Sequence, residues 1–237
     1  MKKALVLNSG GVDSTTCVSI AVKDLGKENV TTVSVFYGQK HSKELECAEK
    51  VAEYYGVAHK IIDLSRTGIM DDSNCPLLRQ SSEEIPEHSY AEQIAENGEG
   101  MVTTYVPFRN GLLLSSVAAL AMAKYPDDEV DIYLGAHADD AAGNAYADCS
   151  QAFTDAINLA ISLGTYGKVH LKAPLVNLNK AGVVKKGLEL GTPYELTWSC
   201  YNGGDMPCGR CGTCIDRAAA FEANGVEDPA LKKEVIE

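Results

Sequence analysis

Short apolar runs alternate, along the first quarter of the chain, with longer segments whose apolar residues recur every three or four positions. Runs of strand length, rich in β-branched residues, lie at 2–8, 30–38 and 58–64. Segments 14–26 and 42–56 lie between them with helical spacing and end at or just before a glycine. This β-α-β-α-β order predicts a parallel sheet flanked by helices.

The alternation resumes beyond residue 105. Helical spacing is present at 109–125, 149–164 and 179–191, and extended runs are present at 129–137 and 168–176. The two halves predict an α/β fold, a Rossmann-like doubly wound parallel sheet, over residues 1–195. Residues 196–237 are expected to form a small C-terminal section in which a cysteine-rich knuckle runs into a helix.

Residues 65–105 interrupt the alternation. The segment is polar, contains two prolines and lacks sustained periodicity. A stretch of this length without regular elements is unusual in a compact domain unless it covers a site or is mobile. We expect a functional lid, and a disordered or decorative insertion is the alternative.

Charge and composition exclude several classes of protein. The chain has 237 residues, 45% of them apolar, so it can bury a substantial core. Its formal net charge is −12, whereas binding a nucleic-acid backbone needs a clustered positive surface. No apolar run is long enough for a membrane span or for the central segment of a signal peptide. We therefore expect a cytoplasmic protein without a nucleic-acid or membrane partner.

The stretch NSGGVDSTT, residues 8–16, follows the first apolar run and leads into a helical segment. Adjacent glycines let the backbone approach a ligand, and the start of a helix offers free N–H groups and a positive dipole end. Three hydroxyl side chains add donors: Ser9, Ser14 and Thr15. Asp13 is expected to cap the helix or to help hold Mg²⁺. The stretch therefore predicts a phosphate site.

Two common phosphate loops do not fit. The Walker loop ends in Gly-Lys-Ser/Thr, but no lysine lies between Lys3 and Lys23, and the dinucleotide fingerprint needs three spaced glycines. SGGVDS instead resembles the hallmark of the PP-loop, or N-type, ATP pyrophosphatase superfamily. The resemblance implies that the loop holds the pyrophosphate end of ATP while the adenylyl group is transferred to an oxygen. It assigns ATP binding to Asn8, Ser9, Gly10, Gly11, Val12, Asp13, Ser14, Thr15, Thr16, Cys17 and Val18.

Half of the eight cysteines fall within fifteen residues near the C-terminus: Cys200, Cys208, Cys211 and Cys214. Four thiolates can close a tetrahedral zinc shell, and glycines within CGRCGTC permit the tight turns that bring the sulfurs together. A full shell leaves no open coordination position, so the expected zinc is structural. An iron–sulfur cluster and free thiols are the alternatives.

Further motifs narrow the resemblance: YGQKH, YVPFRN, AYADC and CYNG leading into CGRCGTC. Together with SGGVDSTTC they extend along nearly the whole chain and are similar to those of the 7-cyano-7-deazaguanine synthase family. The resemblance implies a ligase that converts 7-carboxy-7-deazaguanine and ammonia into the nitrile. ATP activates the acid, ammonia gives the amide, and a second ATP activates the amide oxygen. ATP as co-substrate, Mg²⁺, one zinc ion and a homodimer are the accompanying expectations.

The chain departs from the family pattern in two places. The family commonly has VPGRN where this chain has VPFRN, which places Phe108 near the expected site with an altered wall. It commonly has YPDCR where this chain has YADCS, so that Ala147 and Ser150 replace a proline and an arginine. The second change weakens any role for position 150 in holding an anion.

Three polar residues are the candidates for catalysis. Arg109 is expected to bind a carboxylate or a phosphate, since a guanidinium matches either geometry, and a structural arginine is the alternative. Lys180, at a helix start, is expected to stabilise phosphate, and a solvated lysine is the alternative. Asp148 is expected to accept hydrogen bonds from the purine-like N–H groups of the substrate, and a cap for the helix near Ser150 is the alternative.

Substrate contacts are expected from strand ends and from the retained motifs, because doubly wound sheets place ligands at the carboxyl ends of their strands. The candidates are Tyr37, Gln39, Phe108, Arg109, Asn110, Tyr146 and Asp148. His41 and His137 are expected either to face the site or to have a structural role.

Two other function classes compete with the ligase. A tRNA-modifying sulfur transferase needs a basic surface and reactive cysteines outside the knuckle, and the net charge of −12 opposes it. A non-catalytic nucleotide sensor would not need the intact loop and motifs. The sequence leaves open whether the reaction stops at the amide.

Overall fold

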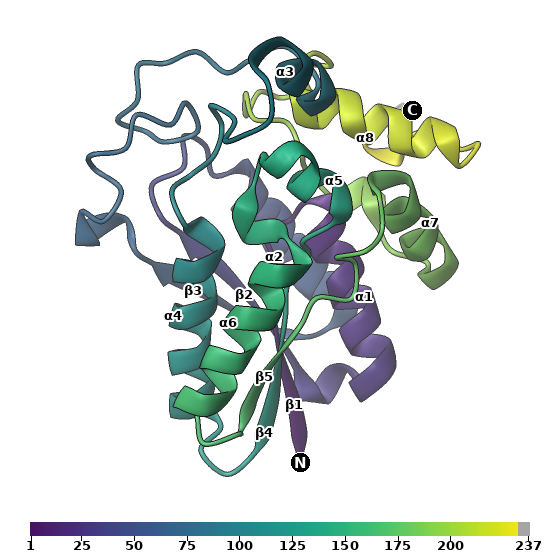
Figure 1. Cartoon of the computed structure of the whole chain (residues 1–237). Helices are drawn as coiled ribbons and strands as arrows, with labels where there is room; N and C mark the ends of the chain where they lie inside the picture. The colour runs from purple at the N-terminus through teal and green to yellow at the C-terminus, as the bar shows by residue number, and fades with distance from the viewer. Residues whose placement is uncertain (232–237) are drawn as a thin grey trace.

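The computed structural model describes residues 1–231, apart from the side chains of Tyr90, Ala91, Glu96 and Asn97. The end of the predicted C-terminal section, residues 232–237, lies outside the described residues. The described strands form a five-stranded parallel sheet in the order β3-β2-β1-β4-β5 (Figure 1). Their bounds are β1 Lys2–Leu7, β2 Val30–Phe36, β3 Ala58–Asp63, β4 Glu129–Tyr133 and β5 Val169–Lys172. The strand order reverses at β1, which confirms the doubly wound α/β prediction.

Helices connect the strands and continue beyond the last one. Their bounds are α1 Val12–Leu25, α2 Lys43–Tyr55, α3 Tyr90–Asn97, α4 Arg109–Lys124, α5 Ala138–Ala141, α6 Gln151–Gly164, α7 Lys180–Leu190 and α8 Gly212–Ala223. Short 3₁₀ turns lie at Lys27–Asn29, Ser65–Thr67, Ala142–Asn144, Ala147–Cys149, Tyr194–Leu196 and Pro229–Leu231. Within the described residues, none of these helices has the length and apolar character needed to cross a membrane.

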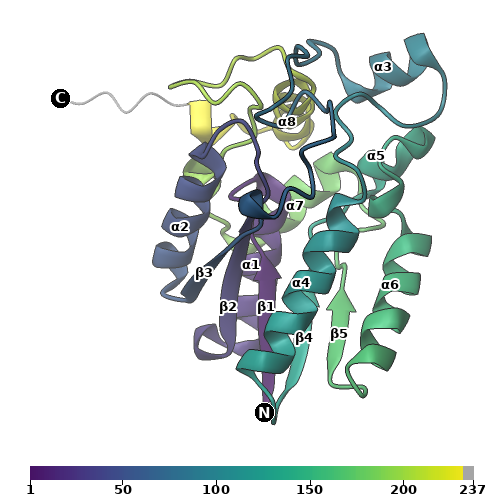
Figure 2. The ribbon, with the colours of Figure 1, turned by 90° about the vertical axis from the view of Figure 1, so that its left-hand side faces the viewer.

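Alternate residues of the central strand point to opposite faces of the sheet, and each face has its own core. Leu5 and Leu7 of β1 pack with apolar residues of α4 and α6. Ala4 and Val6 pack with α1, α7 and α8. Figure 2 shows α4 and α6 together on one side of the strands. Because helices cover both faces, the strands are continuous apolar runs, which explains why the sequence pattern locates them.

The long polar segment after β3 contains one helix that the absence of periodicity did not predict. Ser89 caps α3 by accepting a hydrogen bond from the backbone N–H of Glu92, and the Glu92 carboxylate accepts from the N–H of Ser89 at 2.8 Å. This reciprocal pair is a capping box, whose Ser-x-x-Glu signature was present in the sequence. The helix is too short to show a clear apolar period, so the cap was its only local signal. Whether residues 65–105 act as a lid stays a prediction.

The C-terminal section packs directly on the α1/α7 face. Phe221 of α8 is buried, and its ring meets that of Tyr194 edge to face at 5.4 Å. Arg217, also on α8, forms a two-pronged ion pair with Asp228 at 2.6 and 2.8 Å and donates to the carbonyl oxygen of Tyr194. Both charged side chains are about 5% exposed. This buried pair fixes α8 and the turn that follows it. The predicted boundary at residues 195/196 stays a prediction.

Replacing Asp228 by Asn should therefore destabilise the fold strongly. The change leaves the buried Arg217 guanidinium without its counter-charge, and breaking such a pair lowers the free energy of unfolding by about 3–5 kcal/mol. Urea denaturation measures the loss. Arg210→Ala is the control, because Arg210 pairs with Glu87 on the surface, with side chains 66% and 52% exposed. Equal denaturation midpoints for the two variants would contradict the assignment.

Candidate active site at the carboxyl ends of the strands

A cleft opens at the carboxyl ends of β1, β2 and β4, where the strand order reverses. Its floor is apolar and comes from strand ends and α4: Leu7, Val33, Val35, Leu113 and Leu134. Its walls are polar and come from the glycine loop, α2, the start of α4, the segment after β4, α7 and the C-terminal section. A flat apolar floor beside polar walls suits a planar base that carries charged groups.

The glycine loop is shaped by one close contact. Gly10 has φ +81°, and a Cβ at this position would lie 2.2 Å from the carbonyl oxygen of Glu44 on α2. The Asn8 side chain braces the same contact, because it donates to the carbonyl of Ala48 at 3.1 Å and accepts from the N–H of Gly10 at 3.0 Å. α1 begins at Gly11 without a side-chain cap, so its first N–H groups remain available to an anion.

Only part of the predicted ATP-binding stretch faces the cleft. The lining residues are Asn8, Ser9, Gly11, Val12, Asp13 and Ser14. Thr15, Thr16, Cys17 and Val18 are fully buried within α1. The Thr16 hydroxyl lies 2.7 Å from the Tyr194 hydroxyl, and Cys17 and Val18 belong to the core. These four residues therefore hold the helix that carries the loop.

Asp13 and Lys180 form a compact charge pair at one end of the cleft. The Lys180 ammonium donates to both carboxylate oxygens of Asp13 at 2.7 and 2.6 Å and lies 3.4 Å from the His137 ring. Burial raises the pKa of Asp13, but Lys180 and His137 outweigh it and hold the pKa below the ordinary 3.8. The backbone N–H of Lys180 donates to Asp139 at 2.7 Å. A lysine and a carboxylate thus lie beside the open helix end.

Arg109 also lines the cleft, from the first turn of α4. Burial opposes its charge, but Tyr37, Cys149 and Asp148 raise the pKa of the guanidinium well above its ordinary value. The cation is therefore kept in a half-buried wall of the cleft, where it is suited to bind a carboxylate or a phosphate.

The Asp148 carboxylate is directed at the protein's own backbone. It accepts from the N–H of Asn110 at 2.8 Å, and its main-chain carbonyl accepts from the Asn110 amide at 3.0 Å. The side chain is 3% exposed and does not line the cleft. The alternative role of Asp148, as the cap of the helix near Ser150, is taken by Ser150 itself, whose hydroxyl accepts from the N–H of Phe153 at the N-cap of α6. Asp148 thus fixes the start of α4 and with it the place of Arg109.

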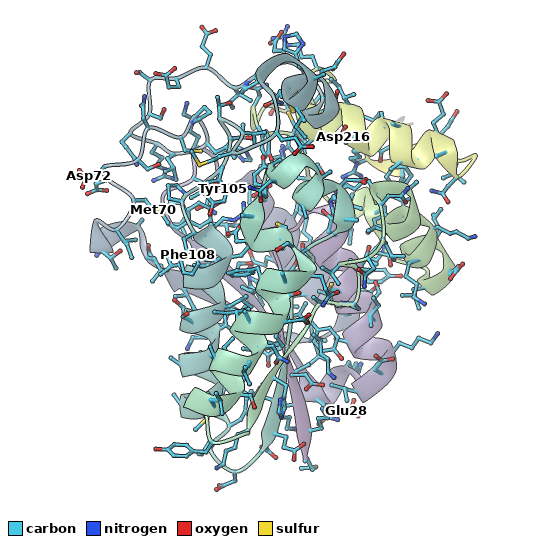
Figure 3. The ribbon with its side chains drawn as sticks, in the orientation of Figure 1. Glu28, Met70, Asp72, Tyr105, Phe108 and Asp216 are labelled. Carbon is cyan, nitrogen blue, oxygen red and sulfur yellow. The ribbon has the colours of Figure 1, made fainter. Side chains whose placement is uncertain are left out.

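The remaining predicted contact residues take different positions. Tyr37, Gln39, Asn110 and Tyr146 line the cleft. The Gln39 amide closes its own turn, since it accepts from the N–H of Tyr37 and donates to the carbonyl of Val35. Phe108 lies outside the lining, is 57% exposed and packs edge to face on Phe153 (Figure 3). Its φ of +48° is a conformation that favours glycine, the residue common in VPGRN.

Several residues in the cleft wall carried no sequence signal. They are Glu44 on α2, Asp139 and Asp140 after β4, and Trp198, Ser199, Tyr201, Thr213 and Asp216 from the C-terminal section. Burial raises the pKa of Glu44 to about 7 and that of Asp216 to about 6. Asp216 lies on α8, above the carboxyl ends of the strands (Figure 3). Of the two uncertain histidines, His137 lines the cleft and His41 does not.

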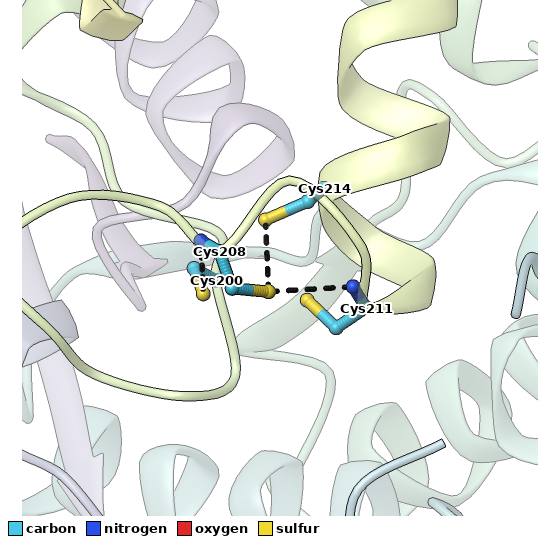
Figure 4. Close-up of side chains that lie close together, drawn as sticks. All are labelled: Cys200, Cys208, Cys211 and Cys214. Atoms are coloured by element: carbon cyan, nitrogen blue, oxygen red, sulfur yellow. Dashed lines mark hydrogen bonds between the residues drawn. The ribbon is translucent and has the colours of Figure 1, made fainter. Parts of the chain in front are cut away.

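The four predicted metal ligands come together in the structure. The sulfur atoms of Cys200, Cys208, Cys211 and Cys214 all lie within 4.8 Å of one another (Figure 4). Zinc–sulfur bonds of about 2.3 Å imply sulfur separations of about 3.8 Å in a tetrahedron, and Cys208 and Cys214 are 4.0 Å apart. Backbone N–H groups donate to the sulfurs of Cys200 and Cys208, as thiolate ligands require. The cluster fits a structural metal.

The strand order, the loop at the end of β1 and the cleft above it define a doubly wound α/β protein with a candidate ligand site at its strand ends. The family described as "Queuosine biosynthesis protein QueC" matches residues 3–225, and the chain belongs to this family.

Two relatives carry the name 7-cyano-7-deazaguanine synthase. The one from Archaeoglobus fulgidus is 43% identical over 98% of this chain and 91% of its own. The one from Caldicellulosiruptor saccharolyticus is 44% identical over 96% and 94%. Among solved structures, NMN synthetase from Francisella tularensis is 16% identical, with a TM-score of 0.47 over 95% of this chain and 77% of that chain.

Gly10→Ala should disrupt the cleft beyond the effect of backbone strain alone. The added methyl group would clash with the Glu44 carbonyl and force α2 and the loop apart. This effect adds to the strain of placing alanine in a left-handed backbone conformation, which costs about 1–3 kcal/mol. Gly38→Ala is the matched control, because Gly38 has φ +104° and open space around it. We expect weaker nucleotide binding and a lower denaturation midpoint for Gly10→Ala than for Gly38→Ala. Equal losses would refute the contact.

Cys211→Ser should remove the metal and lower the melting temperature, since a structural metal site contributes folding free energy. Metal content per chain is the primary readout, measured by elemental analysis beside thermal unfolding. Cys75→Ser is the control, because Cys75 is also buried but lies outside the cluster. A Cys211→Ser protein that kept its metal and its melting temperature would show that the four-thiolate site is wrong.

Proposed function

We propose that this chain converts 7-carboxy-7-deazaguanine and ammonia into 7-cyano-7-deazaguanine at the expense of two ATP. Membership of the QueC family carries this activity, an ATP-dependent ligase in queuosine precursor biosynthesis. The observation that supports its location is the cleft at the strand ends, where an uncapped helix start and two half-buried basic side chains, Lys180 and Arg109, face one space.

The chemistry requires two activations because a carboxylate holds two oxygens that are poor leaving groups. Attack of one oxygen on the α-phosphorus of ATP gives an acyl adenylate and pyrophosphate. Ammonia then displaces AMP and leaves the amide. The amide oxygen attacks a second ATP, and departure of AMP with the carbon–oxygen electron pair leaves the nitrile. In both halves pyrophosphate and AMP leave, so the protein must hold phosphates and position the acid.

The residues divide between these tasks. The free N–H groups at the start of α1, with Ser9 and Ser14, would hold the pyrophosphate. Lys180 would turn from Asp13 to the phosphate and stabilise its charge. The Asp13 carboxylate would then offer an oxygen ligand to the Mg²⁺ that accompanies ATP. Arg109 would bind the substrate carboxylate or the α-phosphate. The apolar floor would take a flat ring.

Zinc is the metal we assign to the four cysteines. A four-iron cluster places a body of eight atoms between its ligands, whereas these sulfurs lie within 4.8 Å of one another, as around a single ion. Hydrogen bonds from the Cys214 thiol and the Thr213 hydroxyl lower the pKa of Cys211, while the same shared hydrogen bond raises that of Cys214. The proposal also includes a homodimer, a cytoplasmic location and a lid at 65–105. These three parts rest on the family resemblance and on composition alone.

The competing sulfur transferase finds little support in the described residues. Burial raises the pKa of Cys17, Cys47, Cys75 and Cys149, the cysteines outside the cluster, so none of them is a ready thiolate. Cys149 lines the cleft but accepts a hydrogen bond from Asn110 at 3.3 Å. An enzyme that stops at the amide remains the alternative within the ligase class.

The test is direct conversion. The purified chain is incubated with 7-carboxy-7-deazaguanine, ammonium, Mg²⁺ and ATP, and the products are followed by mass spectrometry. We expect the acid to disappear, the amide to appear transiently, and the nitrile, AMP and pyrophosphate to accumulate. No loss of the acid would refute the proposal, and an amide that persists would establish the shorter reaction. Release of orthophosphate in place of pyrophosphate would refute the assignment of the loop.

A further inference from the structure

The proposed reaction needs a base that the residues named so far do not supply. After ammonia attacks, the nitrogen must lose one proton to give the amide. Conversion of the amide to the nitrile then requires the loss of two further protons from the same nitrogen. Five carboxylates line the cleft and are candidates for this work: Asp13, Glu44, Asp139, Asp140 and Asp216. The inference therefore rests on the proposed function.

These carboxylates differ in their hydrogen-bond and ion-pair partners. Both oxygens of Asp13 accept from Lys180, Asp139 accepts from the N–H of Lys180, and Asp140 lies 3.4 Å from the His137 ring. Among the described residues, no hydrogen-bond or ion-pair partner is found for the side chains of Glu44 and Asp216, on which only burial and neighbouring charges act. These two carboxylates are therefore the ones whose oxygens are free to take a proton from a ligand.

Different charges act on Glu44 and Asp216. Those that act on Asp216 are the charges of Lys180, Asp139, Asp140 and His137, the groups around the proposed phosphate site. The charge that acts on Glu44 is that of Arg109, which would bind the substrate carboxylate or the α-phosphate. Both of these groups adjoin the reacting carbon, so Glu44 is the better placed of the two carboxylates to serve as the base.

The fold also holds Glu44 firmly in place. Its carbonyl lies against Gly10, so the first turn of α2 is locked to the loop that would hold pyrophosphate. Its side chain is half-buried in the wall shared with Tyr37 and Arg109, which leaves a path for small molecules from solvent. The backbone that carries this carboxylate is fixed between a phosphate loop and an anion-binding arginine, which favours proton transfer at a group activated by ATP.

We infer that Glu44 is the general base that removes protons from nitrogen in both halves of the reaction. In the first half a carbon–nitrogen bond forms, the bond to AMP breaks, AMP keeps the electron pair, and the proton passes from nitrogen to the Glu44 carboxylate. In the second half AMP again leaves with the electron pair, and the two nitrogen protons pass through Glu44 one at a time. The carboxylate returns each proton to solvent at the open side of the cleft.

The surroundings of Glu44 match this work near neutral pH. Burial raises the pKa of Glu44 to about 7, against the lowering effect of Arg109. The other titratable groups that face it are Tyr37 from the segment after β2 and Cys47 from its own helix, and burial raises the pKa of both, so they stay protonated there. We call amide formation and nitrile formation the nitrogen steps. Their rate should rise with pH through about 7, because only the ionised carboxylate accepts a proton.

Glu44→Gln separates activation from the nitrogen steps. Adenylation is measured as acid-dependent exchange of labelled pyrophosphate into ATP, and amide and nitrile formation are measured in single turnovers. We expect exchange within about threefold of wild type and nitrogen steps slowed by about 100-fold or more, the usual contribution of a general base. Hydroxylamine, which is largely unprotonated at neutral pH and a stronger nucleophile, should restore acyl transfer as the hydroxamate. The rising limb of the pH profile should disappear.

Two control variants distinguish a failure of this inference from a failure of the proposed function. Glu46→Gln changes an exposed carboxylate on the same helix and should match wild type. Asp216→Asn should lower exchange and leave the nitrogen steps intact. Nitrile formation by Glu44→Gln at the wild-type rate, or loss of the nitrogen steps in Asp216→Asn alone, overturns the inference. Absence of acid-dependent exchange in the wild-type protein would instead refute the proposed function.

Discussion

The contact at Gly10 is the constraint on which the site depends, because three parts of the chain meet there. The loop after β1 lies against α2, with no room for a Cβ between Gly10 and the Glu44 carbonyl. The Gly10 carbonyl also accepts a hydrogen bond from the N–H of Trp198 at 2.9 Å, which ties the C-terminal section to the same point. Loop, helix and C-terminal section are thus set relative to one another by one residue without a side chain.

The four-cysteine cluster is joined to the cleft through the same section. Four residues close in sequence to the cluster cysteines line the cleft. Trp198 and Tyr201 lie on either side of Cys200, and Thr213 and Asp216 lie on either side of Cys214. Thr213 also donates to the carbonyl of Ser199 at 2.7 Å, which closes the knuckle on itself. The four-cysteine cluster therefore shapes the wall of the cleft.

The sequence predicted the parts of the molecule whose signals are local. Strands buried on both faces appear as apolar runs, and the SGGVDS loop and the cysteine spacing each carry their chemistry within a few residues. Asp148 was assigned to the substrate because a free carboxylate suits that task, but only the fold shows that its oxygen is directed at the Asn110 N–H. Glu44 was missed because its position depends on a contact between elements that no periodicity records.

The central claim is that this cleft activates both carboxylate oxygens by adenylation, and an oxygen label tests it most directly. The acid is prepared with ¹⁸O in both carboxylate positions and is converted with unlabelled ATP in unlabelled water, and the AMP is examined by mass spectrometry. If both oxygens are adenylated, every AMP carries one ¹⁸O atom and pyrophosphate carries none. Label in orthophosphate or pyrophosphate, or unlabelled AMP beside the nitrile, would contradict it.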